Sequence, residues 1–419
     1  MRVSWNDDLT VTGESAGDFA IAAPSITVTA PNTAVKWAFG STQQITWSQN
    51  LGASETVKIE GSKNNGVSWT TLQASAPNAT DTTGAYSWVV TPTPSNNALI
   101  RVSWTQLASV TDTSDVPFTL AAGSIVIGAP LTGAKWGVGS IQKIQWAHNL
   151  GTAETVDIDL STDGGANFSS IATSVANESA TTGSYLWTVT NAATTTAKIR
   201  VKWHAQPTTA GVSGNFAIGV GTIAVAQPSA STNWGIGSTH AITWTSNVGA
   251  TATAKIEVSR DSGGTWSLIT ASAPNTGIYI WPVTGPVAPS GTGRVRVTWN
   301  EGSAVGTSGA FTIANPIVSV SNPNTAGLSF AVGSPLTLAW LHNLGTLETV
   351  KVEINRNYDV DPVNAWELIS ASAINAAVTQ GQLAWVVTGP ATTTARIRVT
   401  WNNPAATSDV SNFNFSITP

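Results

Sequence analysis

The amino-acid sequence predicts an all-β protein made of tandem β-sandwiches. One phrase, Ile-Arg-Val-x-Trp or a close variant, ends in turn at Trp5, Trp104, Trp203, Trp299 and Trp401. Successive copies are 99, 99, 96 and 102 residues apart, which is the length of a whole sandwich domain and well above the roughly 20–50 residues of a solenoid repeat. Short segments alternate apolar and polar residues, and no window has a convincing helical period. We therefore interpret the chain as several copies of one small β domain.

The repeat divides the 419 residues into one incomplete and four complete domains. Residues 1–23 carry only the last two strands of a domain, whereas domain one is 24–122, domain two 123–220, domain three 221–315 and domain four 316–419. The joints between them are short and lack a flexible polar spacer. We expect consecutive domains to lie close together as a semi-rigid rod.

Domain one reads as seven strands, each marked by alternating or continuous apolar residues. They are expected at residues 26–28, 45–47, 57–60, 69–72, 86–90, 100–104 and 118–120. A period of two places Ile45 and Trp47 on one face of their strand, and Ile100 and Val102 on one face of theirs. Two antiparallel sheets that close over these faces make a seven-stranded sandwich.

The composition excludes several classes of protein. Only 10% of the residues are charged and the net charge is −5, so there is no electrostatic footprint for nucleic acid. The chain has no cysteine, which excludes disulfides and thiolate metal sites. The longest apolar stretches fall short of the ~18 residues of a membrane helix, so no membrane insertion is expected in this segment.

The consensus of the domains is Trp-x-x-Gly-Ser, then Ile-x-Trp, Val-x-Ile-Glu, Asp-Gly-Gly-x-x-Trp, Gly-x-Tyr-x-Trp and Ile-Arg-Val-x-Trp. Domain one reads Trp37-Ala38-Phe39-Gly40-Ser41, Ile45-Thr46-Trp47 and Gly84-Ala85-Tyr86-Ser87-Trp88. This pattern resembles the immunoglobulin/fibronectin-III-like repeats of secreted bacterial and archaeal surface proteins, and is similar to the N-terminal repeat of fungal Ser/Thr-rich GPI-anchored cell-wall proteins. The resemblance implies tandem immunoglobulin-like sandwiches that act as spacers, stalks, adhesive surfaces or building units. It supplies no catalytic residues.

The 19 tryptophans are interpreted mainly as core residues, because most recur at inward positions of the repeat. The predicted core tryptophans are Trp47, Trp88, Trp104, Trp146, Trp187, Trp203, Trp244, Trp281, Trp299, Trp340, Trp385 and Trp401. A further series, Trp37, Trp136 and Trp234, lies beside a Gly-Ser turn and is replaced by Phe330 in domain four. That series is expected to plug a sandwich end or a domain joint.

Four arginines point away from the inward tryptophans of their strand, and four acids share the matching outward phase on the third strand. In an immunoglobulin-type sheet the third strand neighbours the sixth. We therefore predict one cross-strand ion pair in each domain, weak on its own. The pairs are Arg101 with Glu60, Arg200 with Asp159, Arg296 with Glu257, and Arg398 with Glu353.

No pattern for catalysis or for a cofactor is present. His148 and His342 precede Asn-Leu-Gly but are replaced by Gln49 and Ser246 in the other domains, which we interpret as a tolerant surface loop. Asp359 and Asp361, in a long loop of domain four, are weak candidates for calcium, because calcium prefers loop carboxylates. We predict that the chain is not an enzyme, and that it needs neither a cofactor nor a metal.

The incomplete first copy would expose Trp5, Phe19 and Ile21 as a lone hairpin. Either the chain is an excerpt of a longer array, or the hairpin completes a neighbouring subunit by strand addition. Both point to a long polymer or stalk. The predicted function is that of an extracellular or cell-surface structural protein forming a fibre, sheath, surface layer or stalk, with copies of itself as partner. The alternative is an adhesin, or a carbohydrate-binding region of a larger secreted protein, with cell-surface glycan as partner.

Overall fold

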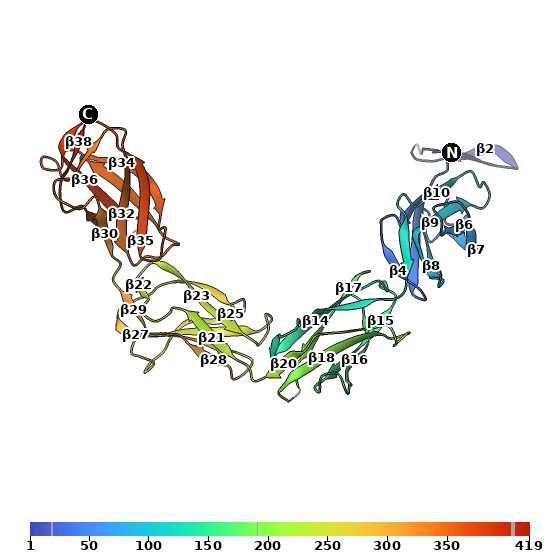
Figure 1. The fold of residues 1–419 in the computed structure, drawn as a ribbon. Helices are drawn as coiled ribbons and strands as arrows, with labels where there is room; N and C mark the ends of the chain where they lie inside the picture. Colours follow the sequence, from blue (N-terminus) through green and yellow to red (C-terminus); the bar gives the residue numbers. More distant parts are fainter. Residues whose placement is uncertain (18–19, 191, 404–406) are drawn as a thin grey trace. The chain divides into compact units, whose positions relative to one another are not determined.

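The computed structural model describes residues 1–17, 20–190, 192–403 and 407–419, and these residues form strands but no helix (Figure 1). The predicted all-β class is confirmed. The described residues group into two compact units. The first contains Met1–Ala134, Lys143–Tyr185 and Thr196–Phe216, and the second contains Lys135–Gln142, Leu186–Thr195 and Ala217–Pro419.

The strands recur in four similar sets, here called repeats one to four, after an N-terminal hairpin. The hairpin consists of β1 (Arg2–Trp5) and β2 (Asp8–Glu14). Repeat one contains β3 (Ile26–Ala30), β4 (Lys36–Ala38), β5 (Thr42–Gln49), β6 (Thr56–Ser62), β7 (Thr70–Pro77), β8 (Thr83–Val89), β9 (Ser95–Trp104), β10 (Thr111–Thr113) and β11 (Phe118–Ala121). Repeat two contains β12 (Ile125–Ala129), β13 (Lys135–Gly137), β14 (Ile141–His148), β15 (Thr155–Ser161), β16 (Ser169–Ala176), β17 (Thr182–Thr188), β18 (Thr194–Trp203), β19 (Ala210–Val212) and β20 (Phe216–Gly219).

The second half of the chain repeats the same order of elements. Repeat three contains β21 (Ile223–Gln227), β22 (Asn233–Gly235), β23 (Thr239–Ser246), β24 (Thr253–Ser259), β25 (Ser267–Pro274), β26 (Ile278–Pro282), β27 (Ala288–Trp299), β28 (Val305–Thr307) and β29 (Phe311–Ala314). Repeat four contains β30 (Val318–Asn322), β31 (Ser329–Ala331), β32 (Pro335–His342), β33 (Thr349–Asn355), β34 (Trp366–Ile374), β35 (Gln380–Val386), β36 (Thr392–Trp401), β37 (Ser408–Val410) and β38 (Phe415–Thr418).

Repeat one shows how these strands make a sandwich. One sheet has the order β3-β5-β8, and the other has β4-β11-β9-β6-β7, with β10 paired to β9. Repeats three and four have the same two sheets. The expected third and sixth strands, β6 and β9, are antiparallel neighbours. This arrangement is that of an immunoglobulin-like sandwich.

The prediction of seven strands is corrected to nine. The two extra elements, β4 and β10, are only three residues long. Segments of this length are too short for an alternating pattern to mark them. β4 pairs in parallel with β11, which is distant in sequence, whereas β10 pairs with the end of the neighbouring strand β9.

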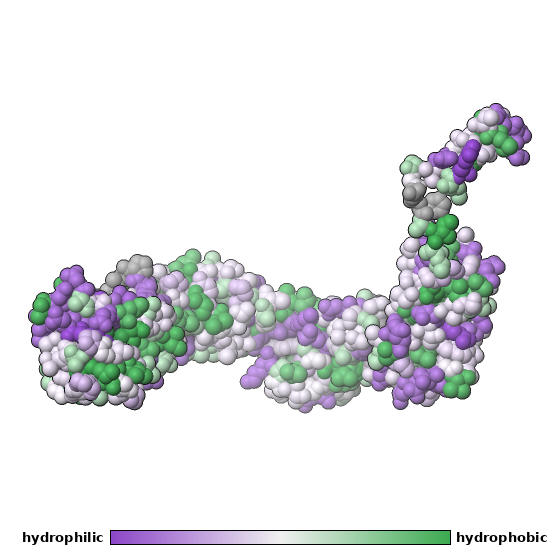
Figure 2. Space-filling view, turned by 90° about the horizontal axis from the view of Figure 1, so that it is seen from above, coloured by the Kyte–Doolittle hydropathy of each residue, from purple (hydrophilic) through white to green (hydrophobic). Residues whose placement is uncertain are grey.

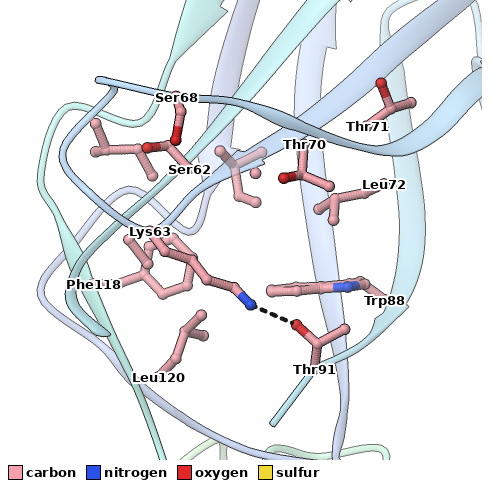
Figure 3. Close-up of a pocket in the computed structure, with 14 residues that line it drawn as sticks. Ser62, Lys63, Ser68, Thr70, Thr71, Leu72, Trp88, Thr91, Phe118 and Leu120 are labelled. Carbon is pink, nitrogen blue, oxygen red and sulfur yellow. Dashed lines mark hydrogen bonds between the residues drawn. The ribbon is translucent and has the colours of Figure 1, made fainter. Parts of the chain in front are cut away.

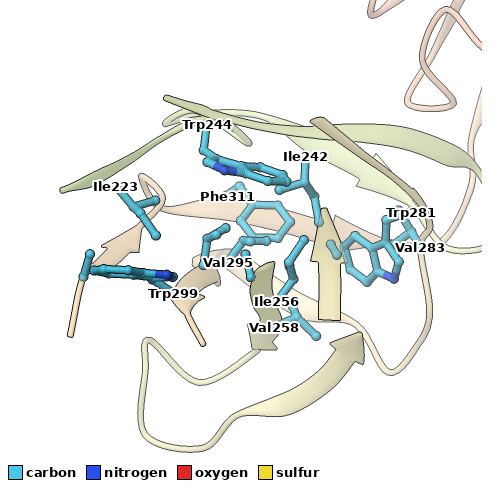
Figure 4. Close-up of a cluster of buried hydrophobic side chains, with 14 of the residues drawn as sticks. Ile223, Ile242, Trp244, Ile256, Val258, Trp281, Val283, Val295, Trp299 and Phe311 are labelled. Carbon is cyan, nitrogen blue, oxygen red and sulfur yellow. The ribbon is translucent and has the colours of Figure 1, made fainter. Parts of the chain in front are cut away.

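The cores of repeats one, two and four are built around an indole that lies against a glycine. Trp47 on β5 is almost fully buried, and its register partner on β8 is Gly84. A Cβ placed at Gly84 would overlap the Trp47 ring, and the same holds for Gly183 against Trp146 and Gly381 against Trp340. The glycine of the Gly-x-Tyr-x-Trp motif therefore has no side chain because the tryptophan ring occupies that space. Figure 4 shows the equivalent core of repeat three, with Trp244 and Ile242 facing Phe311 and Val295.

The N-terminal hairpin keeps the register of its counterpart in repeat one. Ser4 pairs with Thr12 as Ser103 pairs with Thr111. As expected for a hairpin without the rest of a sandwich, Trp5 is 56% exposed. Ile21 is also exposed, whereas Phe19 lies outside the described residues.

Replacing Gly84 by alanine should destabilise repeat one by about 1–3 kcal/mol, because the added methyl overpacks the Trp47 ring. Hydrogen exchange of amides in β5 and β8 of the full chain measures this effect. The control is Gly219→Ala, since a Cβ there has no atom within 4 Å. Equal exchange in both variants would contradict the proposed packing.

Candidate functional site

The most regular polar structure of the chain lies at the joints that precede each repeat. We call the Asn-Leu-Gly segment at 50–52, 149–151 and 343–345, and its Asn-Val-Gly equivalent at 247–249, the joint turn. In repeat two, the Asn149 side chain accepts a hydrogen bond from Ser124 N (2.8 Å) and donates one to Ala122 O (3.0 Å). Asn50, Asn247 and Asn343 hold their own linkers in the same way. Each joint turn thus binds the connecting segment with both ends of one amide.

The main chain of the joint turn also bonds to the preceding repeat. Asn149 O accepts a hydrogen bond from Ala38 N at 3.0 Å, within the first compact unit. Within the second unit, Asn247 O accepts from Gly137 N at 2.8 Å, and Asn343 O from Gly235 N at 2.9 Å. A repeated backbone bond therefore ties each of these three repeats to its predecessor.

We number the joints between successive repeats, so that the first joins repeats one and two and the third joins repeats three and four. A buried tryptophan and a glutamate reinforce the first and third joints. Glu154 accepts from Trp203 Nε1 through one carboxylate oxygen and from Thr42 N of the preceding repeat through the other, both at 2.8 Å. Glu348 bonds Trp401 Nε1 and Thr239 N in the same way, again at 2.8 Å. In repeat three Ala252 occupies this position, so the second joint lacks the carboxylate bridge.

A chain of two hydrogen bonds links the core to the joint turn in every repeat. In repeat two, Trp146 Nε1 donates to Asn177 Oδ1 (3.1 Å), and Asn177 Nδ2 donates to Gly151 O (2.9 Å). Asn78, Asn275 and Asn375 make the same pair of bonds in the other repeats. The side chain that satisfies the buried indole also positions the turn that makes the joint.

The interpretation of His148 and His342 as members of a tolerant surface loop is wrong. Both side chains are buried, and the Nδ1 atom of each accepts a hydrogen bond from the backbone of the joint turn, at Leu150 N (3.1 Å) and Leu344 N (3.2 Å). Gln49 fills this role in repeat one through its Oε1 atom. In repeats one, two and four this position therefore supplies an acceptor, and burial lowers the pKa of His148 and His342, which favours the neutral ring.

A third histidine, His240, lies in the third joint. Its ring stacks on Trp234 with a centroid separation of 4.6 Å, and its Nε2 atom is 2.9 Å from Ser238 Oγ. Burial lowers its pKa to about 4, and nearby His342 adds to the effect. Repeats one and two carry glutamines here, and Gln43 Nε2 donates to Leu150 O of the next repeat. The repeat position thus contacts the following joint turn whichever residue it holds.

The predicted arginine–acid pairs lie on the outer face of the six-stranded sheets of repeats one, three and four, and on β15 and β18 in repeat two. Each arginine is the register partner of its acid, and each pair closes to 2.7 Å. A lysine adds a second bond to each acid: Lys58, Lys202, Lys255 and Lys351. Burial alone would raise the pKa of Glu60, but the bonds from Lys58 and Arg101 hold it below its ordinary value.

An aromatic ring that covers each arginine was missed from the sequence. Arg101 Cζ lies 4.2 Å from the centre of the Trp69 ring, and Arg200 lies over Phe168, Arg296 over Trp266 and Arg398 over Trp366 at 4.0–4.1 Å. The signal was present in repeats one to three, where an aromatic residue follows a turn that contains Asn or Asp and Gly, whereas Trp366 of repeat four follows a longer loop. Because ring and carboxylate both engage the guanidinium, we interpret this cluster as a structural element of the face.

The predicted core tryptophans are buried at ten of the twelve positions, whereas Trp104 and Trp385 are half-buried. The joint series Trp37, Trp136 and Trp234 is also buried. Trp37 packs on Phe118 at 4.8 Å and Trp234 on Phe311 at 5.3 Å, at the end of the sandwich core. These indoles are therefore not open to solvent as flat platforms.

The two calcium candidates bond to neighbouring groups of the chain. Both oxygens of Asp359 accept from Asn414 Nδ2 at 3.0 Å, and Asp361 accepts from the backbone of Val363 and Asn364. In the part of the chain that the structure describes, no three His, Cys, Asp or Glu side chains gather as a metal site would require. Calcium at this loop remains a prediction from the sequence.

No family model and no curated protein matches this chain. Solved structures that resemble it include "Sidekick-1 immunoglobulin domains 1-5", with 8% identity over 94% of this chain and 81% of that one and a TM-score of 0.25. The fibronectin(III)-like modules of Clostridium thermocellum CbhA show 14% identity over 46% and 93%, with a TM-score of 0.17. A variant of titin domains I67-I69 shows 10% identity over 71% and 99%, with a TM-score of 0.19.

These similar structures are tandem immunoglobulin or fibronectin-III-like domains. By its own strand order, the chain is an all-β array of immunoglobulin-like sandwiches. Among the described residues there is no helix of the length and apolarity needed to cross a bilayer.

The variant Gly151→Ala should loosen the first joint without unfolding repeat two. An added Cβ would lie 2.7 Å from the Gln43 side chain and displace its bond to Leu150 O. Gly52→Ala is the matched control, because Gly52 also has a positive φ but no atom within 4 Å of the added carbon. Hydrogen exchange around residues 38–43 should accelerate only in Gly151→Ala. Equal acceleration in both variants would show that backbone strain alone is responsible.

Stability should fall as the pH falls from about 6.5 to about 4, partly through His240. In this window the unfolded state binds a proton at His240 and the folded state does not, so folding becomes less favourable, by up to about 3 kcal/mol for a group with this pKa difference. The variant His240→Gln introduces the glutamine that repeats one and two have at this position. Its free energy of unfolding should depend less steeply on pH. An unchanged slope between pH 7 and pH 4.5 in urea titrations would refute the role of this ring.

Proposed function

We propose that this chain is an extracellular structural protein whose immunoglobulin-like repeats form a fibre, sheath, surface layer or stalk, without catalysis. The observation that carries the proposal is the repeated joint. An asparagine at the same position of each repeat binds the linker, and a backbone bond reaches the preceding repeat at three successive joints. A chain that served only to display independent domains would not need this repetition.

The joints give a physical basis for transmitting load along the array. A pull on one linker acts on the joint turn through the asparagine side chain, and the joint turn is bonded to the buried core through a second asparagine. Each bond contributes only about 1 kcal/mol, but together they must break before a linker can extend. Joints of this kind favour a stiff spacer over a flexible tether.

The proposed partner of the chain is a further copy of itself. The strands β8 and β7 are open edges of their sheets in repeat one, and equivalent strands in the other repeats carry exposed aliphatic side chains. Val89 is 59% exposed, Leu186 56%, Ile280 48% and Val386 58%. On the visible face, apolar residues are interspersed with polar ones (Figure 2). Such edges favour lateral association, and few charges need to be desolvated.

The alternative function, an adhesin or a carbohydrate-binding region, has less support. Binding of glycan to an aromatic platform requires exposed indoles, but Trp37 and Trp136 are buried at their sandwich ends. The half-buried aromatic rings of the outer face are covered by arginines. We therefore favour the structural function, with the cell surface or extracellular space as its location.

Electron microscopy and sedimentation of the full chain test this proposal. We expect assemblies that grow with protein concentration. The double variant Val89→Lys/Val386→Lys should dissolve these assemblies, because a lysine on an open edge opposes strand association. The control is Val67→Lys, which changes an exposed residue in a turn. Monodisperse monomers of the unmodified chain at all concentrations would overturn the proposal.

A further inference from the structure

Repeat one contains a pocket that enters its core, with a volume of about 480 Å³. This volume lies within the range of about 300–1,000 Å³ that is usual for sites of small molecules. Its floor is formed by the buried side chains of Trp88, Ile100, Phe118 and Leu120. The exposed residues Ser68, Thr70, Thr71 and Thr91 also line the pocket. The site therefore combines an apolar interior with a polar rim.

The pocket results from one small residue at a position that the other repeats fill. Gly61 on β6 corresponds to Leu160, Val258 and Ile354, whose side chains are buried in their own cores. Register confirms the equivalence, because Gly61 pairs with Ile100 as Leu160 pairs with Ile199. Gly61 has no positive φ that would require glycine. The backbone at this position thus tolerates a side chain, and its absence leaves space between the sheets.

The only charged side chain that lines the pocket is Lys63. Its ammonium group donates a hydrogen bond to Thr91 Oγ1 at 3.0 Å, and Figure 3 shows it beside Trp88. An ammonium group has three hydrogens to donate, so this bond leaves capacity for another acceptor. No carboxylate partner of Lys63 is found in the described part of the chain.

The equivalent cations of repeats three and four are held by backbone and side-chain acceptors of their own repeats. Arg260 donates to Thr284 O (2.7 Å) and Pro286 O (2.9 Å). Arg356 donates to Thr388 O and pairs with Glu367 at 3.1 Å. Repeat two has Thr162 at this position. In repeat one, the core position without a side chain, Gly61, thus lies beside a cation, Lys63, that can still donate hydrogen bonds.

We propose that the pocket of repeat one binds a small amphipathic anion, with an apolar body on Trp88 and Phe118 and a carboxylate on Lys63. A charge-assisted hydrogen bond from an ammonium group suits a carboxylate better than a neutral hydroxyl. The apolar floor provides most of the buried area. The inference does not depend on the structural function proposed above, because the site lies within one sandwich.

Titration calorimetry of the full chain with octanoate tests the site, with octanol as its neutral analogue and acetate as its head group alone. We expect saturable binding of one octanoate per chain, weaker binding of octanol and none of acetate. Lys63→Met should weaken octanoate about tenfold and leave octanol unchanged, because it removes the charge and keeps an apolar side chain.

Two variants fill the pocket by giving position 61 the residue that repeat two or repeat three has there. Gly61→Val and Gly61→Leu should abolish octanoate binding and raise the unfolding temperature of repeat one, provided that the Leu72 side chain, 3.3 Å from the added Cβ, turns aside. Retained folding of either variant, monitored by hydrogen exchange, makes its binding result valid. As a control, Thr162→Lys adds the cation to repeat two without the space and should create no second site.

Three results would overturn the proposal. One is the absence of saturable octanoate binding by the unmodified chain. Another is binding that persists in both folded Gly61 variants. The third is an octanoate affinity that Lys63→Met does not change, since the ligand would then not be recognised as an anion.

Discussion

The constraint on which the rest of this structure depends is the burial of an indole whose N–H group must still be satisfied. In each repeat, the tryptophan of the first sheet packs in the core and donates to an asparagine. A buried indole without an acceptor would cost about 1–3 kcal/mol. The same asparagine donates to the joint turn. In each of the four repeats, one asparagine side chain therefore couples the packing of the core to the geometry of the joint turn.

The differences between the joints follow from single residues within this common plan. Glu154 and Glu348 each bridge a tryptophan of their own repeat and a backbone amide of the preceding one. With Ala252 in that position, the second joint depends on the backbone bond and on Gln142. The third joint replaces that glutamine with a buried neutral histidine, His240. The array is thus uniform in framework but not in the strength or pH response of its joints.

The outer faces follow a different physical rule. Each acid is buried enough to need partners, and receives an arginine, a lysine and, through the arginine, an aromatic lid. In repeat two the lysine comes from β18 as Lys202, because Asp157 occupies the place of Lys58. Asp159 thus keeps an arginine and a lysine as partners, although Asp157 adds a second carboxylate that repeat one does not have. Surface ion pairs contribute little singly, but a networked and partly desolvated cluster fixes the face more firmly.

The sequence by itself determined the all-β class, the positions of seven of the nine strands, the inward tryptophans and the facing of arginine and acid. These features follow from periodicity, which acts locally and recurs in every repeat. Only the tertiary structure decided the role of Asn-Leu-Gly, because the backbone partner of its asparagine lies roughly 110 residues earlier, in the preceding repeat. It also decided the role of His148 and His342, because their burial against the joint turn is not marked by a local pattern. It likewise decided the pocket beside Gly61, since an empty space is a property of what surrounds a residue. A pattern along one strand records which way a side chain points, but not what it meets.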